Sequence, residues 1–343
     1  MFKFGIYGPD SQARCPLCKS LDVKPREKYE GKRGRITKYY CQHCDHKFVY
    51  GPLLGTHFPE WAVNMVLTLI VLGVRPKAIA DALKRGSFGV KIEISAQTVQ
   101  NMINRAVKLL LRFETLVERK EPSPEWIIDD AFVSLPLPLR NKTGAFHVEC
   151  PGCKYKWTEQ TMERTITCPN CGREIRKLRS WIIVIQDLGT KYILTTYLSL
   201  GCRTSGATRD AMKLAMERAK GIPICIKSDS LQSQILGIKE FCPHINIIAK
   251  TKRRYYSWIN EIEGLISYIR RAGISRRGSR SPESLQNRLG LLRFDYNFLK
   301  PHSSLGGETP AMVAGIVYPE VSTWFELISF AYSYINSRGV SGR

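Results

Sequence analysis

Four C-x-x-C pairs contain eight of the chain's eleven cysteines, and their spacing is that of metal-binding turns. Each pair presents two thiolates on one tight turn, so two pairs supply the four ligands of a tetrahedral Zn²⁺ site. Because four cysteines leave no position open for water, both predicted zinc ions are structural. The first set is Cys15, Cys18, Cys41 and Cys44, and the second is Cys150, Cys153, Cys168 and Cys171.

The remaining cysteines and two nearby histidines need no metal. Cys202, Cys225 and Cys242 occur singly in apolar surroundings, which predicts buried thiols. His43 and His46 are predicted to be surface residues, because the first cysteine set is already complete.

Positive charge dominates the composition. The chain carries 52 Lys and Arg against 30 Asp and Glu, a formal net charge of +22, and its isoelectric point is about 9.6. Such an excess favours a nucleic-acid partner. No stretch reaches the roughly 18 apolar residues of a membrane helix, and the N-terminus lacks an apolar secretion segment. We therefore expect a cytoplasmic, nucleoid-associated prokaryotic protein with no membrane partner.

In this basic background, Asp129, Asp229 and Glu263 are candidate ligands of Mg²⁺. Asp129 lies in an apolar strand beside Asp130, and strand alternation points the two side chains to opposite faces. At least one of them needs a compensating partner, because an unpaired buried carboxylate is costly. A metal ion and a salt bridge both meet that need, and the strand alone does not choose between them.

The other two acids are equally ambiguous from the residues alone. Asp229 ends a short apolar strand, where ligands of open α/β sheets gather, but an Asp there also caps a following helix. Glu263 lies in a helix whose apolar stripe includes Ile262 and Ile269. Glu261 and Glu263 flank that stripe almost symmetrically, so helical periodicity does not separate them.

The segment after residue 125 has the elements of an α/β domain. A strand at 126–135 precedes the second cysteine set, and a hairpin over 180–199 that turns at 187–189 follows it. Three strands followed by alternating helices and strands predict a mixed sheet flanked by helices. The later elements are expected as a helix at 204–221, a strand at 222–229, a helix at 231–241, a strand at 245–250, a helix at 255–271 and a further helix at 322–335.

Between the first cysteine set and this domain the pattern is helical, with helices predicted at 61–73, 76–86 and 95–111. Pro76 is suited to open the second helix and Gly86 to close it, and Ser95 is a suitable N-cap for the third. Three helices with a turn before the third predict a helix-turn-helix region, and a plain three-helix linker bundle is the alternative.

The third of these helices has one apolar and one polar face. Val99, Ile103 and Val107 are predicted to face inward. The polar residues predicted to enter a DNA groove are Gln97, Thr98, Gln100, Asn101 and Arg105.

Several motifs resemble those of DDE-type insertion-sequence transposases, which have an RNase H-like (integrase) catalytic core. Residues 126–130, WIIDD, resemble W-x-x-D-E, and residues 228–230 resemble T/S-D-G with Ser in the place of Gly. Residues 260–263 resemble N-x-x-E. Residues 296–311 resemble Y-N-F-x-x-P-H-x-x-L-G-G-x-T-P-A almost position for position. The likeness covers roughly residues 125–316, interrupted by the second cysteine set, which lengthens the interval between the first two acids.

The resemblance implies that Asp129, Asp229 and Glu263 hold two Mg²⁺ (or Mn²⁺) ions for two-metal transesterification. It implies cleavage at the ends of a mobile element to free a 3′-OH, joining of that hydroxyl to target DNA, and no nucleotide cofactor. A homodimer or larger assembly is expected, because two DNA ends must be brought together. The basic residues expected to contact phosphates are Lys252, Arg253, Arg254, Arg270, Arg271, Arg276, Arg277 and Arg280.

The expected organisation is a zinc ribbon at 1–52, a helix-turn-helix region at 58–118, an RNase H-like core at 125–316 with a zinc ribbon inserted at about 146–176, and a C-terminal helix and tail at 317–343. Two other functions fit parts of this plan. One is a non-catalytic DNA-binding regulator built from a zinc ribbon and a helix-turn-helix, and the other is a nuclease without strand transfer.

Overall fold

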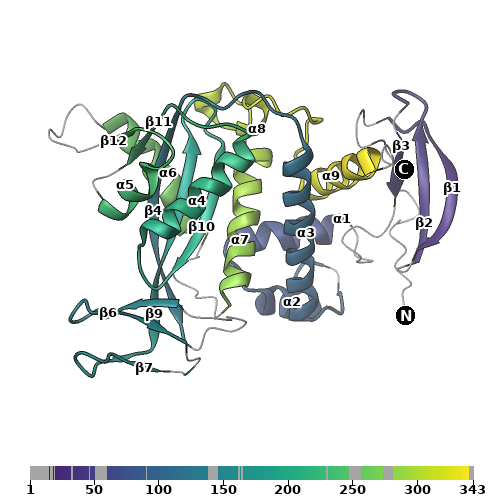
Figure 1. Cartoon of the computed structure of the whole chain (residues 1–343). Coiled ribbons are helices and arrows are strands. Elements are labelled where there is room, and N and C mark those ends of the chain that lie inside the picture. Colours follow the sequence, from purple (N-terminus) through teal and green to yellow (C-terminus); the bar gives the residue numbers. More distant parts are fainter. Residues whose placement is uncertain are drawn as a thin grey trace. The chain divides into compact units, whose positions relative to one another are not determined.

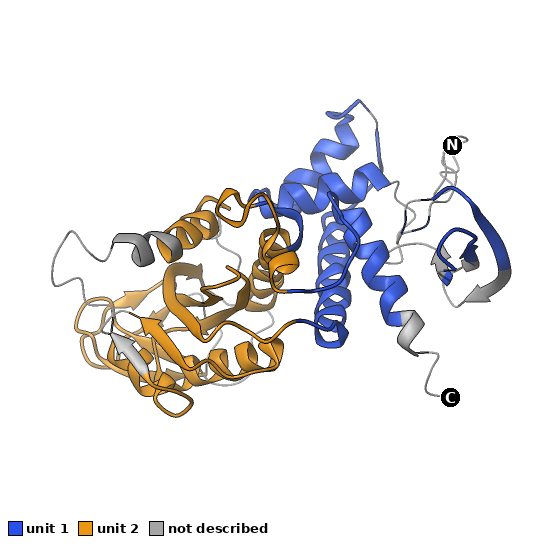
Figure 2. Cartoon of the chain, turned by 90° about the horizontal axis from the view of Figure 1, so that it is seen from above, with its two compact units in different colours: residues 1–119, 298–301, 315–343 blue, residues 120–297, 302–314 orange. Residues whose placement is uncertain are grey.

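The computed structural model divides the chain into two compact units, which are described separately (Figure 2). Unit 1 comprises residues 1–119, 298–301 and 315–343, and unit 2 comprises residues 120–297 and 302–314. The structure describes residues 15, 18, 20–31, 34–45, 47–50, 60–89, 91–137, 146–160, 163, 165–228, 231–246, 256–272 and 281–339.

The first cysteine set of unit 1 lies at a three-stranded antiparallel sheet. β1 (Val23–Gly31) pairs with β2 (Gly34–Cys41), which pairs with β3 (Lys47–Tyr50). The register places Val23 opposite Cys41, so the chain leaving the first C-x-x-C turn lies beside the chain entering the second.

The described helices of unit 1 are α1 (Glu60–Val71), α2 (Pro76–Arg85), α3 (Ala96–Leu116) and α9 (Trp324–Gly339). As predicted, Pro76 begins α2, Gly86 ends it in the left-handed conformation, and the Ser95 hydroxyl caps α3 by accepting the Thr98 N–H. The connection at residues 86–95 is longer than the three- or four-residue turn of a standard helix-turn-helix.

The C-terminal helix α9 packs within the helical part of unit 1. The Phe113 ring of α3 makes edge contacts with Phe330 and Tyr334 of α9, at centroid distances of 5.6 and 5.5 Å. The Asn64 side chain of α1 accepts a hydrogen bond from the Phe325 N–H at 2.7 Å. The last segment of the chain therefore completes a core begun before residue 119.

Unit 2 contains a mixed five-stranded sheet, in the order β10-β9-β4-β11-β12. Strand β9 pairs antiparallel with both β10 and β4, and β11 and β12 are added in parallel beside β4, which confirms the predicted mixed α/β sheet. The hairpin turn is also confirmed, although its first strand begins at residue 177. The strands are β4 (Glu125–Pro136), β9 (Lys177–Asp187), β10 (Ile193–Leu200), β11 (Cys225–Ser228) and β12 (His244–Asn246).

Helices cover both faces of this sheet (Figure 1). On one face, α6 (Tyr256–Arg271) and α7 (Pro282–Phe294) share an apolar cluster with alternate residues of β4, from Ile127 to Leu135. The other face is covered by α4 (Ser205–Ala219) and α5 (Gln232–Ile238).

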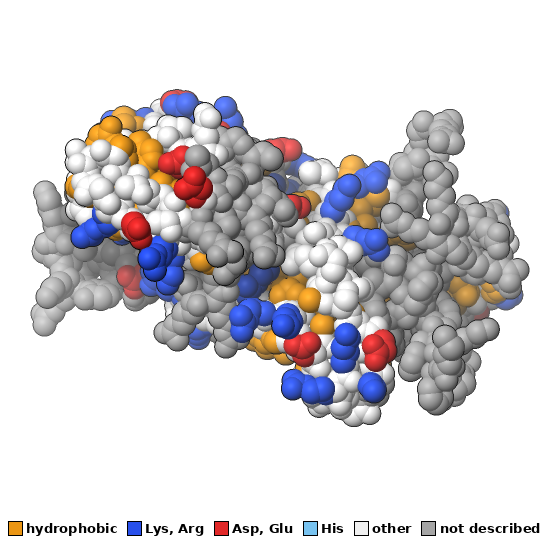
Figure 3. Space-filling model, turned by 90° about the horizontal axis from the view of Figure 1, so that it is seen from below, with side chains coloured by type: hydrophobic (Ala, Val, Ile, Leu, Met, Phe, Trp, Pro, Cys, Tyr) orange, Lys and Arg blue, Asp and Glu red, His pale blue; other side chains and the backbone are white. Residues whose placement is uncertain are grey.

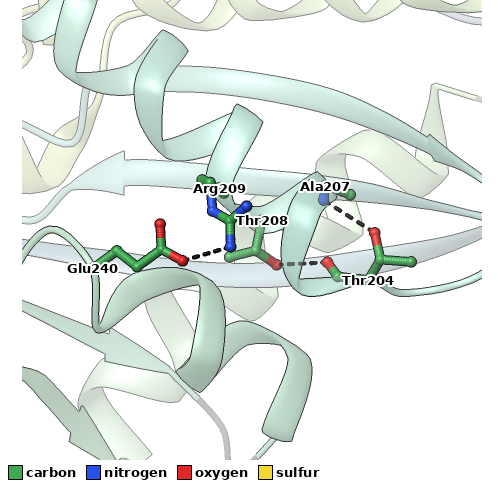
Figure 4. Close-up of polar contacts among 5 residues, drawn as sticks. All are labelled: Thr204, Ala207, Thr208, Arg209 and Glu240. Atoms are coloured by element: carbon green, nitrogen blue, oxygen red, sulfur yellow. Dashed lines mark hydrogen bonds and ion pairs between the residues drawn. The ribbon is translucent and has the colours of Figure 1, made fainter.

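The N-terminus of α4 is capped, and the helix is tied to the turn after α5 (Figure 4). The Thr204 hydroxyl accepts the Ala207 N–H at 3.0 Å, and Thr208 donates its hydroxyl to the Thr204 carbonyl at 3.4 Å. Arg209 pairs with Glu240 at 2.5 Å.

The second cysteine set lies in an insertion between β4 and β9. There β5 (Phe146–Glu149) pairs with β6 (Lys156–Glu159), and β7 (Ile166–Thr167) pairs with β8 (Glu174–Ile175). Four buried side chains of these strands belong to the same apolar cluster as β4 and α6, so the insertion packs onto the sheet: Phe146, Val148, Ile166 and Ile175.

After α7 the chain forms a π-helical turn, η2 (Asp295–Leu299), whose last two residues belong to unit 1. A 3₁₀ turn, η3 (Ser303–Leu305), and α8 (Pro310–Val313) follow in unit 2. Among the described residues, no helix has the length and apolar character needed to cross a bilayer.

Candidate functional site

Asp129 and Asp130 point to opposite faces of the central strand β4, as strand alternation predicts. Asp130 faces α4 and α5. Its carboxylate pairs with Arg203 at 2.8 Å and accepts a hydrogen bond from the Gln234 amide at 3.2 Å. The Asp130 side chain is only 5% exposed. The buried charge on this face is therefore compensated by protein groups.

Asp129 lies on the face that α6 covers. It shares that face with Ile127 and Ala131, which pack in the same cluster as Ile262 and Ile266 of α6. Asp129 is half-buried, and its Oδ1 accepts the Asp130 backbone N–H at 2.7 Å. The Asp129 carboxylate therefore lies between the sheet and α6.

Helix α6 packs against this face of the sheet and carries several candidate residues. Ile262, Leu265, Ile266 and Ile269 are buried as predicted, and Glu263 is exposed. The side chain of Glu261 lies outside the described residues, so the choice between the two glutamates stays a prediction. Arg270 and Arg271 are exposed in the last turn of α6.

Asp229 lies outside the described residues, directly after Ser228, the last residue of β11. The described part of β11 pairs in parallel with β4, with Ile226 opposite Trp126 and Lys227 opposite Ile127. Six of the predicted phosphate contacts also lie outside the described residues: Lys252, Arg253, Arg254, Arg276, Arg277 and Arg280.

Lys227 forms a further charged contact beside this part of the sheet. Its side chain is 1% exposed, and its ammonium lies 2.5 Å from the carboxylate of Glu125. A buried cation is tolerated only with such a partner. This pair was not predicted, although a lysine between the apolar run Ile224–Ile226 and Ser228 is itself a sign of a paired buried charge.

Each cysteine set brings its four sulfur atoms together, all within 4.8 Å of one another. In the first set, Cys15 Sγ lies 3.5 Å from Cys44 Sγ, and Cys18 Sγ lies 3.5 Å from Cys41 Sγ. A zinc tetrahedron with Zn–S bonds of about 2.3 Å has S···S edges of about 3.8 Å. The second set matches as closely, with Cys150–Cys171 at 3.6 Å and Cys153–Cys168 at 3.7 Å. The residues present therefore fit one structural zinc ion in each set.

The electrostatics of two of these thiols also suit zinc. Burial raises the pKa of the Cys41 thiol, but hydrogen bonds from the backbone of Cys44 and His43 outweigh it and bring the pKa to about 7. A hydrogen bond from the Asn170 side chain is the largest influence on Cys153 and lowers its pKa to about 6. Thiolates are the form that binds metal. The three single cysteines, Cys202, Cys225 and Cys242, are buried as predicted.

The predicted DNA-binding residues of α3 fall into two groups. Gln97, Asn101 and Arg105 are exposed, whereas Thr98 and Gln100 are half-buried. The Thr98 hydroxyl lies 2.8 Å from the Ser95 hydroxyl, so it belongs to the helix cap. The predicted inward residues Val99, Ile103 and Val107 are buried.

No protein-family model matches the chain, and no curated protein matches it at a significant level. Solved structures do show similarity, and they include transposase complexes. A pre-cleavage Mos1 transpososome is 10% identical, with a TM-score of 0.26 over 83% of this chain and 79% of that one. The strand transfer complex of the Drosophila P element transposase is 9% identical, with a TM-score of 0.28 over 81% and 80%. Scores this low do not establish a shared fold or activity, so the function is argued from the residues themselves.

The sequence analysis also missed the partners of Asp130. Arg203 follows β10 and precedes the N-cap of α4, and its guanidinium stacks 3.5 Å from the ring centroid of Trp181 on β9. A basic residue just before a helix is an unremarkable pattern, so only the sheet topology reveals that Arg203 reaches β4.

Proposed function

We propose that this chain is a DDE-type transposase that cleaves DNA at the ends of a mobile element and joins the freed 3′-OH to target DNA. The observation that carries this proposal is the division of labour between Asp129 and Asp130. Arg203 and Gln234 compensate Asp130 on one face of β4. Asp129 occupies the other face, the one against which α6 packs, and it is the residue that the motif resemblance selects as a metal ligand.

The donor set fits the implied metal. Carboxylate oxygens are the ligands that Mg²⁺ and Mn²⁺ prefer, so Asp129, Asp229 and Glu263 would hold two such ions. When bound, these ions stabilise the charge that develops on the attacking and leaving oxygens of a phosphodiester. The Asp130 N–H restrains one oxygen of the Asp129 carboxylate. Arg270 and Arg271, exposed at the end of α6, would neutralise phosphates of the bound strand.

The topology supports the RNase H-like core that the resemblance implies. A three-stranded antiparallel meander is extended by two parallel strands, and helices cover both faces. The first acid lies on the central strand, and β11, which precedes the second acid in the sequence, is its parallel neighbour. The third acid lies on a helix that packs against the same face as the first.

DNA is the proposed partner, and the charge distribution supports it. The net charge of +22 must be neutralised by a polyanion or by salt. Figure 3 shows basic side chains at several places on the face in view, with acidic ones among them. An assembly of at least two copies is proposed, because joining requires that two DNA ends be held together.

The test is a Mg²⁺-dependent cleavage and joining assay on DNA that carries the segments bracketing the gene. Wild type is expected to cut and join, and Asp129→Asn and Asp229→Asn are expected to do neither while still binding the DNA. Asp210→Asn is the matched control, because Asp210 is an exposed aspartate on α4 of the same unit. Its activity should equal that of wild type.

The alternatives give different results in the same assay. Binding without cutting by wild type would favour the non-catalytic regulator, which fits the ribbon and α3 but leaves the acids unexplained. Cutting without joining would favour a nuclease. Full activity of Asp129→Asn would reject the assignment of the first acid.

A further inference from the structure

We infer that α3 reads an adenine in the major groove of duplex DNA through Gln97 and Asn101, and that Arg105, Lys108 and Arg112 hold the adjoining phosphates. This inference deepens the DNA-binding part of the proposed function and rests on it. All five side chains are exposed. Because each residue of an α-helix is rotated by about 100° from the one before, these five positions occupy an arc of about 80° around the helix axis. We call them the α3 stripe.

The charge of α3 fits a polyanion. Its three basic residues, Arg105, Lys108 and Arg112, all belong to the α3 stripe. Its one acid, Glu114, is 2% exposed, so α3 presents no carboxylate to solvent. A helix face that is merely solvated usually mixes both signs of charge. The absence of exposed acid along all of α3 therefore favours contact with phosphates.

The amide end of the α3 stripe is organised for a base edge. Gln97 Nε2 donates a hydrogen bond to Asn101 Oδ1 at 3.0 Å, one helical turn away. This bond leaves the Gln97 carbonyl oxygen and the Asn101 amide hydrogens available as an adjacent acceptor and donor. Adenine presents the complementary pair in the major groove, a donor at N6 and an acceptor at N7. Because each amide holds the other in place, less side-chain freedom is lost on binding.

The order of residues along α3 agrees with groove entry. In helix-turn-helix proteins the N-terminal residues of the recognition helix reach the bases, and here these are Gln97 and Asn101. The basic residues follow further along the helix axis: Lys108 lies about 4.5 Å beyond Arg105, and Arg112 lies about 6 Å beyond Lys108. Thr98 serves the cap with Ser95, and Gln100 bonds Asn104 at 2.8 Å on a half-buried side, so neither belongs to the reading surface.

The experiment selects binding sites for the full-length zinc-loaded chain from a pool of random 20-base-pair duplexes, then measures affinity for the selected duplex by fluorescence anisotropy. Wild type should select a motif with a fixed A·T pair. Replacing that pair by G·C should weaken wild-type binding roughly tenfold or more. Gln97→Ala and Asn101→Ala should abolish this discrimination and leave binding to a scrambled duplex unchanged.

The cations are expected to behave differently from the amides. Lys108→Ala should weaken binding to the selected and scrambled duplexes equally and reduce the salt slope by about one. Lys213→Ala, an exposed lysine on α4 of unit 2, is the matched control and should change neither. Thermal unfolding of each variant identifies any that fold poorly.

The outcomes separate this inference from the proposed function. If both amide variants select the wild-type motif with wild-type discrimination, or if wild type has no A·T preference, α3 does not read adenine. A transposase that joins DNA in the assay above would survive that result. If wild type binds no duplex at all, both proposals are rejected.

Discussion

At the scale of single residues, two neighbouring carboxylates on β4 have separate tasks. Asp130→Ala is expected to lower the free energy of unfolding by about 1–3 kcal/mol, because Arg203 and Gln234 would lose a buried partner. Asp129→Ala should cost less, since the carboxylate is half-buried and accepts a hydrogen bond from the adjacent Asp130 backbone N–H. Urea unfolding of both variants measures the difference. Equal destabilisation would show that Asp130 is not the structural member of the pair.

Asn297, which belongs to the motif at residues 296–311, has a structural role. Its side chain is fully buried and bonds both backbone groups of Ile193 on the edge strand β10, at 2.9 Å to the N–H and 3.0 Å to the carbonyl. Asn297→Ala should therefore lower the free energy of unfolding by about 1–3 kcal/mol. Amide hydrogen exchange should show faster exchange at Ile193. Unchanged exchange there would contradict this role.

Residue-level features could be predicted only where they follow from local pattern. The opposite directions of Asp129 and Asp130 follow from alternation along one strand. The Arg203 partner does not, because it depends on the meander that places β9 between β10 and β4, so that Arg203 reaches Asp130 across β9. The His302 ring lies beside that of Tyr296, with centroids 4.4 Å apart and the ring planes inclined at 58°, a contact within the motif at residues 296–311.

At the scale of elements, the contact of the inserted ribbon with the sheet depends on Gly201. This residue has a φ of +85°, and a Cβ there would lie 1.3 Å from the carbonyl oxygen of His147 on β5. Gly201→Ala is expected to cost at least about 2 kcal/mol, since the backbone of β5 must move and a positive φ is strained for alanine. Chemical unfolding measures the change.

Gly264 on α6 provides the control of opposite sign. No atom lies within 4 Å of a Cβ at this position, and it is exposed in a helix interior. Gly264→Ala is expected to stabilise the protein by roughly 0.5–1 kcal/mol. If the two glycine variants shift stability alike, the close approach at Gly201 is not real.

The elements with strong periodicity were predictable, and those without it were not. The capping residues of α2 and α3 gave the first residue of each helix to within one position, but α3 continues to Leu116, five residues beyond its predicted end. Helix α7 was missed, although Ser281 caps it by accepting the Ser284 N–H and Pro282 follows. The buried residues of α7 include a charged one, Arg288, next to an apolar one, Leu289. The sequence of α7 therefore does not divide into one polar and one apolar face.

At the scale of the whole molecule, the two zinc sets differ in what they stabilise. The first set forms a small cluster of its own with Val23 and Tyr39, whereas the strands around the second set contribute side chains to the large cluster of unit 2. Cys150→Ser should therefore reduce bound zinc from two ions to one and also speed hydrogen exchange in β4. Cys15→Ser should cause the same zinc loss without the effect on β4. Zinc analysis and exchange mass spectrometry test this difference.

The fold class was predictable from the sequence, but the packing of segments that are distant in the chain was not. Alternating elements after residue 125 predicted a mixed sheet. The return of the last segment to the helices of unit 1 was not foreseen, because its apolar contacts, such as Phe330 with Phe113, are with residues more than 200 positions earlier. Long-range pairings of this kind have no local signature in the chain.

The insertion point of the second ribbon has a consequence for how relatives of this protein are found. Pro136, the last residue of β4, pairs with Lys177, the first residue of β9, so the inserted segment leaves and re-enters the sheet at adjacent positions. The length of such a closed loop affects stability only weakly, by about 0.6 kcal/mol per doubling. The number of residues between Asp129 and Asp229 can therefore differ among proteins with this sheet, provided that the core contacts of Phe146, Val148, Ile166 and Ile175 are replaced. A sequence pattern that fixes this interval would fail to recognise proteins built in this way.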